Sequence, residues 1–226
     1  MIHLFALLSL LLCGVCYTGF QNSSHFHNTS NRRSLLLLVF GGALLLRLLL
    51  AYTTHGFSND IACFAAWADR IFTLGPGQFY SAEMFTDYPP GFMYVLYLIG
   101  ALRSLLQIPY YSDLHILLLK LPAILCDIAC GFLLYREAVK RLHFSDLQGI
   151  FAASAYLFQP AVILNSSCWG QVDSVYTLMI ILMCLFLMKG NLLPAYAVYG
   201  LGVLLKPQML IFTPVLLAGI WDHVFL

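Results

Sequence analysis

Long apolar runs separated by short polar segments make up most of the chain. The runs lie at about 1–20, 35–52, 91–107, 114–136, 147–165, 174–188, 191–205 and 208–226. Several approach the length of about 20 apolar residues that a helix needs to cross a bilayer. The pattern predicts an all-α protein, a polytopic transmembrane helical bundle over 35–226, preceded by an N-terminal hydrophobic segment and polar linker at 1–34.

Composition excludes a water-soluble globular protein. Of the 226 residues, 61% are hydrophobic and only 9% are charged, whereas about 25% are charged in a typical soluble domain. A net charge of +1 provides no basic surface for nucleic acid, so we expect no nucleic-acid partner. Nearly all of the seven cysteines lie in apolar runs without metal-ligand spacing. We interpret them as packing residues and expect no metal site.

Positive charges predict which helix ends face the cytoplasm, because Lys and Arg favour that side of a membrane. They cluster before the second run and after the fourth, as Arg32, Arg33, Arg136, Lys140 and Arg141. If both clusters are cytoplasmic and 35–52 crosses outward, an odd number of crossings must return the chain to Arg136, so either 91–107 or 114–136 does not span. We predict that 91–107 is a juxtamembrane or re-entrant helix, because it begins at a Pro-Pro-Gly break.

The polar stretch at 53–91 then forms a large extracytoplasmic first loop. Asp60, Phe64, Trp67 and Ile71 recur there at helical spacing, which predicts an amphipathic helix along the membrane surface. The Ser-Asn-Asp sequence that ends at Asp60 is either an N-terminal helix cap, the more frequent role of these residue types, or part of a functional site.

Three further polar segments fall on the same predicted face. One precedes a stiff Pro-Pro pair, one connects two apolar runs with more polar groups than a turn needs, and one places an ammonium beside a helix-breaking proline. In the second segment, the structural interpretations are an interfacial tryptophan for Trp169 and a helix cap for Asp173. In the third, the structural interpretation is nonspecific contact of Lys206 with lipid phosphate. The residues concerned are Asp87, Tyr88, Trp169, Gln171, Asp173, Lys206 and Gln208.

Ionisable residues inside the apolar runs also need an explanation. Arg47, Lys120 and Asp127 would each cost about 2.5–3.5 kcal/mol at the centre of a lone membrane helix. Each either extends its charge to the membrane surface, forms an internal pair, or takes part in function. Lys120 and Asp127 share one helix but stand about 10 Å apart along its axis, so they cannot pair directly.

Four motifs, in order along the chain, resemble the GT-C membrane glycosyltransferases, above all bacterial mannosyltransferases related to the second GPI mannosyltransferase. They are Asp60 with Phe64-Ala65-Ala66-Trp67-Ala68, Asp87-Tyr88-Pro89-Pro90-Gly91, Trp169-Gly170-Gln171-Val172-Asp173-Ser174 and Lys206-Pro207-Gln208. The second motif also resembles that of the dolichyl-phosphate-glucose glucosyltransferases. The resemblance implies a GT-C-like bundle whose first loop carries juxtamembrane helices. Since such enzymes carry more spans, it also implies that the domain at 35–226 is incomplete at its C-terminus.

The resemblance further implies a hexosyltransferase that moves a hexose, with mannose favoured over other hexoses, from a polyprenyl-phosphate donor to a hydroxyl of a glycan or glycolipid acceptor. Transfer would occur with inversion at the extracytoplasmic face, with Asp60 as general base. Lys206, or else Arg47, would bind the donor phosphate in contact with membrane lipid. No cofactor beyond the lipid-linked sugar is implied, and a bacterial plasma membrane is favoured over the endoplasmic reticulum. The remaining substrate-binding residues would be Asp87, Tyr88, Trp169, Gln171, Asp173 and Gln208.

Two other functions share most of these features. A transporter or lipid scramblase would also place Arg, Lys and Asp within a helical bundle. Against it, the polar segments gather at one predicted face, and the sequence contains no internal repeat. An inactive, truncated family member would share every feature except turnover.

Overall fold

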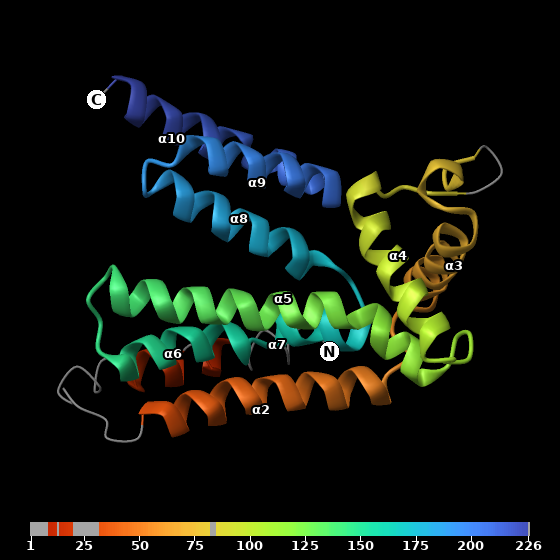
Figure 1. Cartoon of the computed structure of the whole chain (residues 1–226). Helices are drawn as coiled ribbons and strands as arrows, with labels where there is room; N and C mark the ends of the chain where they lie inside the picture. The colour runs from red at the N-terminus through yellow and green to blue at the C-terminus, as the bar shows by residue number, and fades with distance from the viewer. Residues whose placement is uncertain (1–8, 13, 20–31, 82–84, 226) are drawn as a thin grey trace. The chain divides into compact units, whose positions relative to one another are not determined.

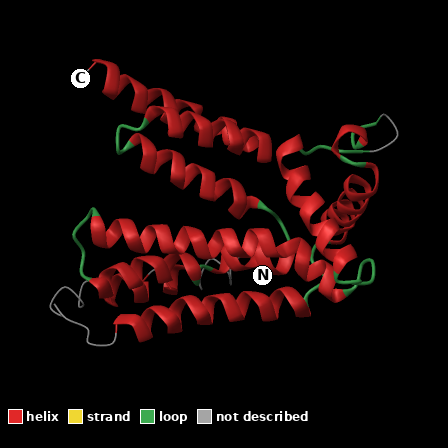
Figure 2. Cartoon of the chain, in the orientation of Figure 1, coloured by secondary structure: helices red, strands yellow, loops and turns green. Residues whose placement is uncertain are grey.

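The computed structural model describes residues 9–12, 14–19, 32–81 and 85–225, and within these ranges the chain is helical without a strand (Figures 1 and 2). Most of the N-terminal segment at 1–34 lies outside the described residues. From residue 32 onward the elements are α2 (Arg32–Thr53), α3 (Ser58–Leu74), η1 (Pro76–Gln78), α4 (Pro90–Leu105), α5 (Asp113–Lys140), α6 (Asp146–Leu157), α7 (Pro160–Ile163), η2 (Leu164–Trp169), α8 (Asp173–Leu187), α9 (Leu192–Leu205), η3 (Pro207–Phe212) and α10 (Thr213–Phe225).

The chain forms two compact units, each built from two separate stretches. Unit 1 comprises Met1–Gly56 and Ala123–Ser174, and unit 2 comprises Phe57–Pro122 and Val175–Leu226. Helix α5 belongs to both, because the division falls within it at Pro122.

Two helices are long and apolar enough to cross a membrane, namely α2 with 22 residues and α5 with 28. A third crossing is possible if α6 and the segment Pro160–Trp169, which are bent by 51° at a short break, form one span. These lengths and compositions support a membrane protein, as the apolar runs predicted.

The bend interrupts a run that the sequence presents as continuous, 147–165. Helix α6 ends at Leu157, and α7 begins only at Pro160. The reason is local, because proline disfavours helical backbone at the residue before it, and Gln159 is accordingly extended with ψ 119°. The chain then continues into η2, a π-helix.

Several helices are shorter than a straight crossing requires. At 1.5 Å per residue, an α-helix needs about 20 residues to cross a hydrocarbon core of about 30 Å. Helix α4 has 16 residues, in keeping with the prediction that 91–107 does not span. Helices α8 and α9 have 15 and 14 residues, so their lengths lend no support to the crossings expected at 174–188 and 191–205.

The core of unit 1 lies between α2, α5 and α6, where its buried residues include Ala43, Ile150 and Leu157. At one end of this unit, Arg32 Nε lies 3.2 Å from Asp146 Oδ1. The Tyr135 hydroxyl donates to the same Asp146 oxygen at 2.9 Å. The start of α2 and the end of α5, which carry the two basic clusters, therefore lie at the same end of unit 1.

Unit 2 is organised around the close packing of α3 on α4. A Cβ at Gly100 would stand only 2.5 Å from the Ala68 carbonyl oxygen, so the helices approach more closely than a larger residue allows. The apolar side of α3, including Phe64 and Trp67, is buried. The amphipathic helix expected there is thus present, and α4 contacts it.

Candidate active site

The residues singled out from the sequence divide between the two units. Five lie in unit 2, on α3, on the segment before α4 and around the end of α9: Asp60, Asp87, Tyr88, Lys206 and Gln208. Four lie in unit 1, on α2 and on the segment from η2 to α8: Arg47, Trp169, Gln171 and Asp173.

In unit 2, Lys206 meets Tyr88, which is far from it in the sequence. Helix α9 ends at Leu205, and Lys206 is extended with φ −153° because Pro207 follows it. Its side chain is only 8% exposed. The ammonium nitrogen lies 5.6 Å from the centre of the Tyr88 ring and 5.7 Å from that of Tyr176. Both distances are within the range of a cation–π interaction.

Tyr88 is held in place by an aromatic cluster of unit 2. Its ring centre lies 5.5 Å from that of Phe64, 5.7 Å from Trp67 and 5.5 Å from Phe92. The backbone nearby is tied as well, because the Tyr80 hydroxyl donates to the Tyr88 carbonyl oxygen at 3.0 Å. The Asp-Tyr-Pro-Pro segment therefore has a defined position relative to α3 and α4.

Asp60 lies in the first turn of α3. The helix begins at Ser58 with Phe57 at the N-cap position, where no side-chain cap hydrogen bond forms. The expected cap formed by Ser58, Asn59 or Asp60 is therefore wrong, because the helix starts one residue too early for any of them to occupy that position. A carboxylate in the first turn is still favourable, since it faces the positive end of the helix dipole.

Asp60 and Asp87 both lie close enough to Cys63 to act on its charge. Burial raises the pKa of the Cys63 thiol, and the carboxylates of Asp87 and then Asp60 raise that pKa further. The start of α3 and the segment before α4 thus bring together the two acidic residues that the sequence singled out. Gln208 follows Lys206 in η3 and is exposed.

In unit 1, the end of η2 and the residues after it include three of the residues singled out from the sequence. Asp173 starts α8, and its Oδ2 accepts a hydrogen bond from Asn165 Nδ2 at 2.8 Å. Trp169 ends the π-helix and is 50% exposed. Gln171 lies between them and is half-buried.

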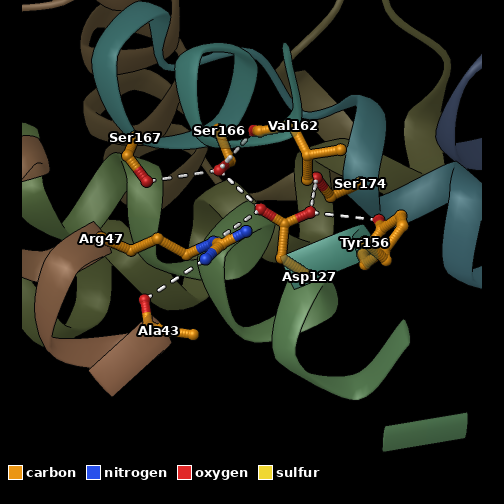
Figure 3. Close-up of polar contacts among 8 residues, drawn as sticks. All are labelled: Ala43, Arg47, Asp127, Tyr156, Val162, Ser166, Ser167 and Ser174. Carbon is orange, nitrogen blue, oxygen red and sulfur yellow. Dashed lines mark hydrogen bonds and ion pairs between the residues drawn. The ribbon is translucent and has the colours of Figure 1, made fainter. Parts of the chain in front are cut away.

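Arg47 forms an internal pair, which was one of the explanations left open by the sequence. Its Nε donates to Asp127 Oδ2 at 3.1 Å, and both side chains are 0% exposed (Figure 3). Its Nη1 reaches the carbonyl oxygen of Ala43 at 3.3 Å. Two nitrogens of the Arg47 guanidinium, Nε and Nη1, therefore donate hydrogen bonds inside unit 1. Lys120 is likewise fully buried, in unit 2.

Asp127 accepts hydrogen bonds that sequence reasoning did not foresee. Ser166 donates to Oδ2 at 2.6 Å, and Ser174 donates to Oδ1 at 2.5 Å. Tyr156 also points its hydroxyl at Oδ1, at 3.3 Å (Figure 3). In the sequence, Ser166 and Ser174 stand at either end of a polar segment, and this was the only hint of such hydrogen bonds. Their spacing does not identify Asp127 as the residue that accepts those bonds.

Within the part of the chain that the structure describes, no three His, Cys, Asp or Glu side chains are grouped to hold a metal ion. Comparison of the chain with protein-family models, with curated proteins and with solved structures finds no match. The functional argument therefore depends on the chemistry of the side chains themselves.

Proposed function

We propose that this protein is a membrane glycosyltransferase with a GT-C-like helical bundle. In this proposal it transfers mannose from a polyprenyl-phosphate donor to an acceptor hydroxyl at the extracytoplasmic face of a bacterial plasma membrane. The acceptor is a glycan or a glycolipid, and the anomeric configuration inverts. The proposal depends on the motif resemblance and on the side chains gathered in unit 2.

The observation that carries the proposal is the contact between Lys206 and Tyr88, which joins two of the four motifs. A polyprenyl phosphate that leaves the sugar carries negative charge, and a cation in water-poor surroundings stabilises such charge strongly. Lys206 sits at a helix end rather than within a span, as contact with a lipid headgroup requires. Because Arg47 is paired with Asp127, we assign the phosphate to Lys206 rather than to Arg47.

Asp60 is the proposed general base. As the acceptor oxygen forms its bond to the anomeric carbon, Asp60 takes the proton of the acceptor hydroxyl, and the bond from that carbon to the phosphate oxygen breaks. A carboxylate is a weak base for an alcohol, so the proton moves late and leaving-group stabilisation matters more. Asp87, Tyr88 and Gln208 would bind substrate close to this step.

The test is transfer of labelled mannose from polyprenyl-phosphate mannose to membrane acceptors. Asp60→Asn should abolish transfer while donor binding and thermal stability in detergent persist. Asp113→Asn is the matched control, because Asp113 also lies in the first turn of a helix, α5, and its substitution removes a similar helix-dipole interaction. Transfer that is indifferent to Asp60, or no transfer from any lipid-linked donor, would overturn the proposal.

The competing function is that of a transporter or lipid scramblase, and one observation favours it. Arg47 and Asp127 form a buried charge pair on α2 and α5, the two candidate spans, and charges within spans often mark transport pathways. Lipid movement in proteoliposomes that persists in Asp60→Asn and is lost in Arg47→Met/Asp127→Asn, which removes both buried charges together, would support that function. An inactive truncated family member would give neither transfer nor lipid movement.

A further inference from the structure

The connector from Ser167 to Val172, which comprises the end of η2 and the residues before α8, is closed at its base by two sets of hydrogen bonds within unit 1. In one, Asn165 donates directly to Asp173 across the connector. In the other, Ser166 and Ser174 each donate to a different oxygen of the Asp127 carboxylate (Figure 3). One carboxylate on α5 therefore holds both ends of the connector.

The backbone of the connector is also internally constrained. Gly170 has φ 88°, a left-handed conformation that favours glycine. The backbone N–H groups of Gly170 and Gln171 both donate to the Asn165 carbonyl oxygen, at 3.1 and 2.9 Å. Thr54 is the residue that follows α2, and its hydroxyl donates to the Ser167 carbonyl oxygen at 3.3 Å. A closed base and a fixed turn together leave the connector few alternative conformations.

The Asp127 carboxylate is suited to this role because its hydrogen-bonding capacity is used. An ionised carboxylate has about four acceptor positions. Here Arg47 and Ser166 share Oδ2, while Ser174 and Tyr156 share Oδ1. Arg47 supplies the opposite charge that a buried carboxylate needs. Arg47 thus lies against the carboxylate as its counter-charge, and an ionised carboxylate can accept from both serines at once.

We propose that Asp127 is a positioning residue that fixes the connector from Ser167 to Val172 in one conformation and so orients the exposed indole of Trp169. Asp127 acts through Ser166 and Ser174 and need not touch a ligand. The inference concerns the conformation of this connector, and it holds whether or not the proposed transfer reaction is correct.

The test follows the conformation of Trp169 by fluorine NMR. The chain contains three tryptophans, so protein labelled with 5-fluorotryptophan should give three fluorine resonances, and Trp169→Phe identifies that of Trp169. In Ser166→Ala/Ser174→Ala, which keeps the Arg47–Asp127 ion pair and should therefore fold, we expect this resonance to broaden or to split. Ser167→Ala is the matched control, because Ser167 is equally buried but contacts Ser166 rather than Asp127.

A second variant separates positioning from general stability. In Arg47→Met/Asp127→Asn both charges are removed together, so the thermal midpoint should stay close to that of wild type. Asparagine has only one accepting oxygen, so it can hold Ser166 and Ser174 together less well than a carboxylate does. The Trp169 resonance should therefore remain broadened in a stable protein. A sharp, wild-type resonance in the double-serine variant, or an equal change in Ser167→Ala, would overturn the inference.

Discussion

Arg47 in unit 1 and Lys206 in unit 2 are two of the buried cations, and they are held in different ways. Arg47 in unit 1 is 0% exposed and is paired with a carboxylate that three hydroxyl groups also contact. Lys206 in unit 2 is 8% exposed and lies over the faces of two tyrosine rings. The first cation belongs to a neutralised network within candidate spans, and the second lies at a helix end. Burial alone therefore does not distinguish a cation paired within candidate spans from one that lies at a helix end.

Substitution of Arg47 alone should have the largest effect. In Arg47→Met the Asp127 carboxylate keeps its hydroxyl donors but loses its counter-charge in buried surroundings, which typically costs about 3–5 kcal/mol. We expect a strongly lowered unfolding midpoint in detergent, or no folded protein. The double variant with Asp127→Asn is the control and should recover most of the loss. A single variant as stable as wild type would contradict a stabilising ion pair in unit 1.

A smaller effect is expected where unit 2 packs most tightly. In Gly100→Ala the new methyl group would meet the Ala68 carbonyl oxygen at 2.5 Å and the Phe72 Cβ at 2.8 Å, so α3 and α4 must separate. Overpacking of this kind costs about 1–3 kcal/mol. Gly41→Ala in α2 is the control, because no atom lies within 4 Å of the added carbon. Equal thermal midpoints for the two variants would mean that the helix pair of unit 2 is not closely packed.

The interaction energy between Lys206 and Tyr88 should be smaller than either of these two losses of stability. A double-mutant cycle with Lys206→Met and Tyr88→Leu removes the effect of each substitution on other neighbours and leaves the pairwise energy. We expect about 0.5–2 kcal/mol, which is typical of a cation–π interaction. Tyr88→Phe retains a ring and should preserve most of this coupling. A coupling of zero would remove the observation that joins the two motifs.

The smallest effect concerns the thiol of Cys63. Because burial, Asp87 and Asp60 raise its pKa, the reactive thiolate is scarcer at a given pH than in an ordinary cysteine. Asp87→Asn should lower that pKa, so alkylation below the thiol pKa should be faster, and Asp60→Asn should act less strongly. Mass spectrometry of the Cys63 peptide after brief maleimide treatment measures the rate. Unchanged rates in both variants would place the carboxylates away from Cys63 and from each other.

The helices could be predicted from the sequence, but most of their polar contacts could not. Apolar runs identify α2 and α5 because a helix that crosses a bilayer needs about 20 predominantly apolar residues. Pro160 is visible in the sequence, and it explains why 147–165 is not one helix. The N-terminus of α3 was harder, since Ser58 looks like a cap residue but Phe57 occupies that position.

Long-range pairings were beyond sequence reasoning for a physical reason. Arg47 and Asp127 are 80 residues apart, and which of the buried charges meet depends on the relative rotation and height of α2 and α5. The apolar pattern constrains neither quantity, because lipid-facing and core-facing positions are equally apolar in a membrane helix. The same holds for Lys206 and Tyr88, whose contact depends on how α9 ends beside the segment before α4.

The separation of Arg47 from Asp127 also has a consequence for biogenesis. During synthesis at about 5–20 residues per second, the 80 residues between them take about 4–16 s to emerge. Over that interval a newly made α2 carries an arginine without its counter-charge, at an insertion cost of about 2.5–3.5 kcal/mol. The counter-charge of Arg47 is therefore supplied only after α5 has been synthesised, so among the described helices an earlier candidate span is completed by a later one.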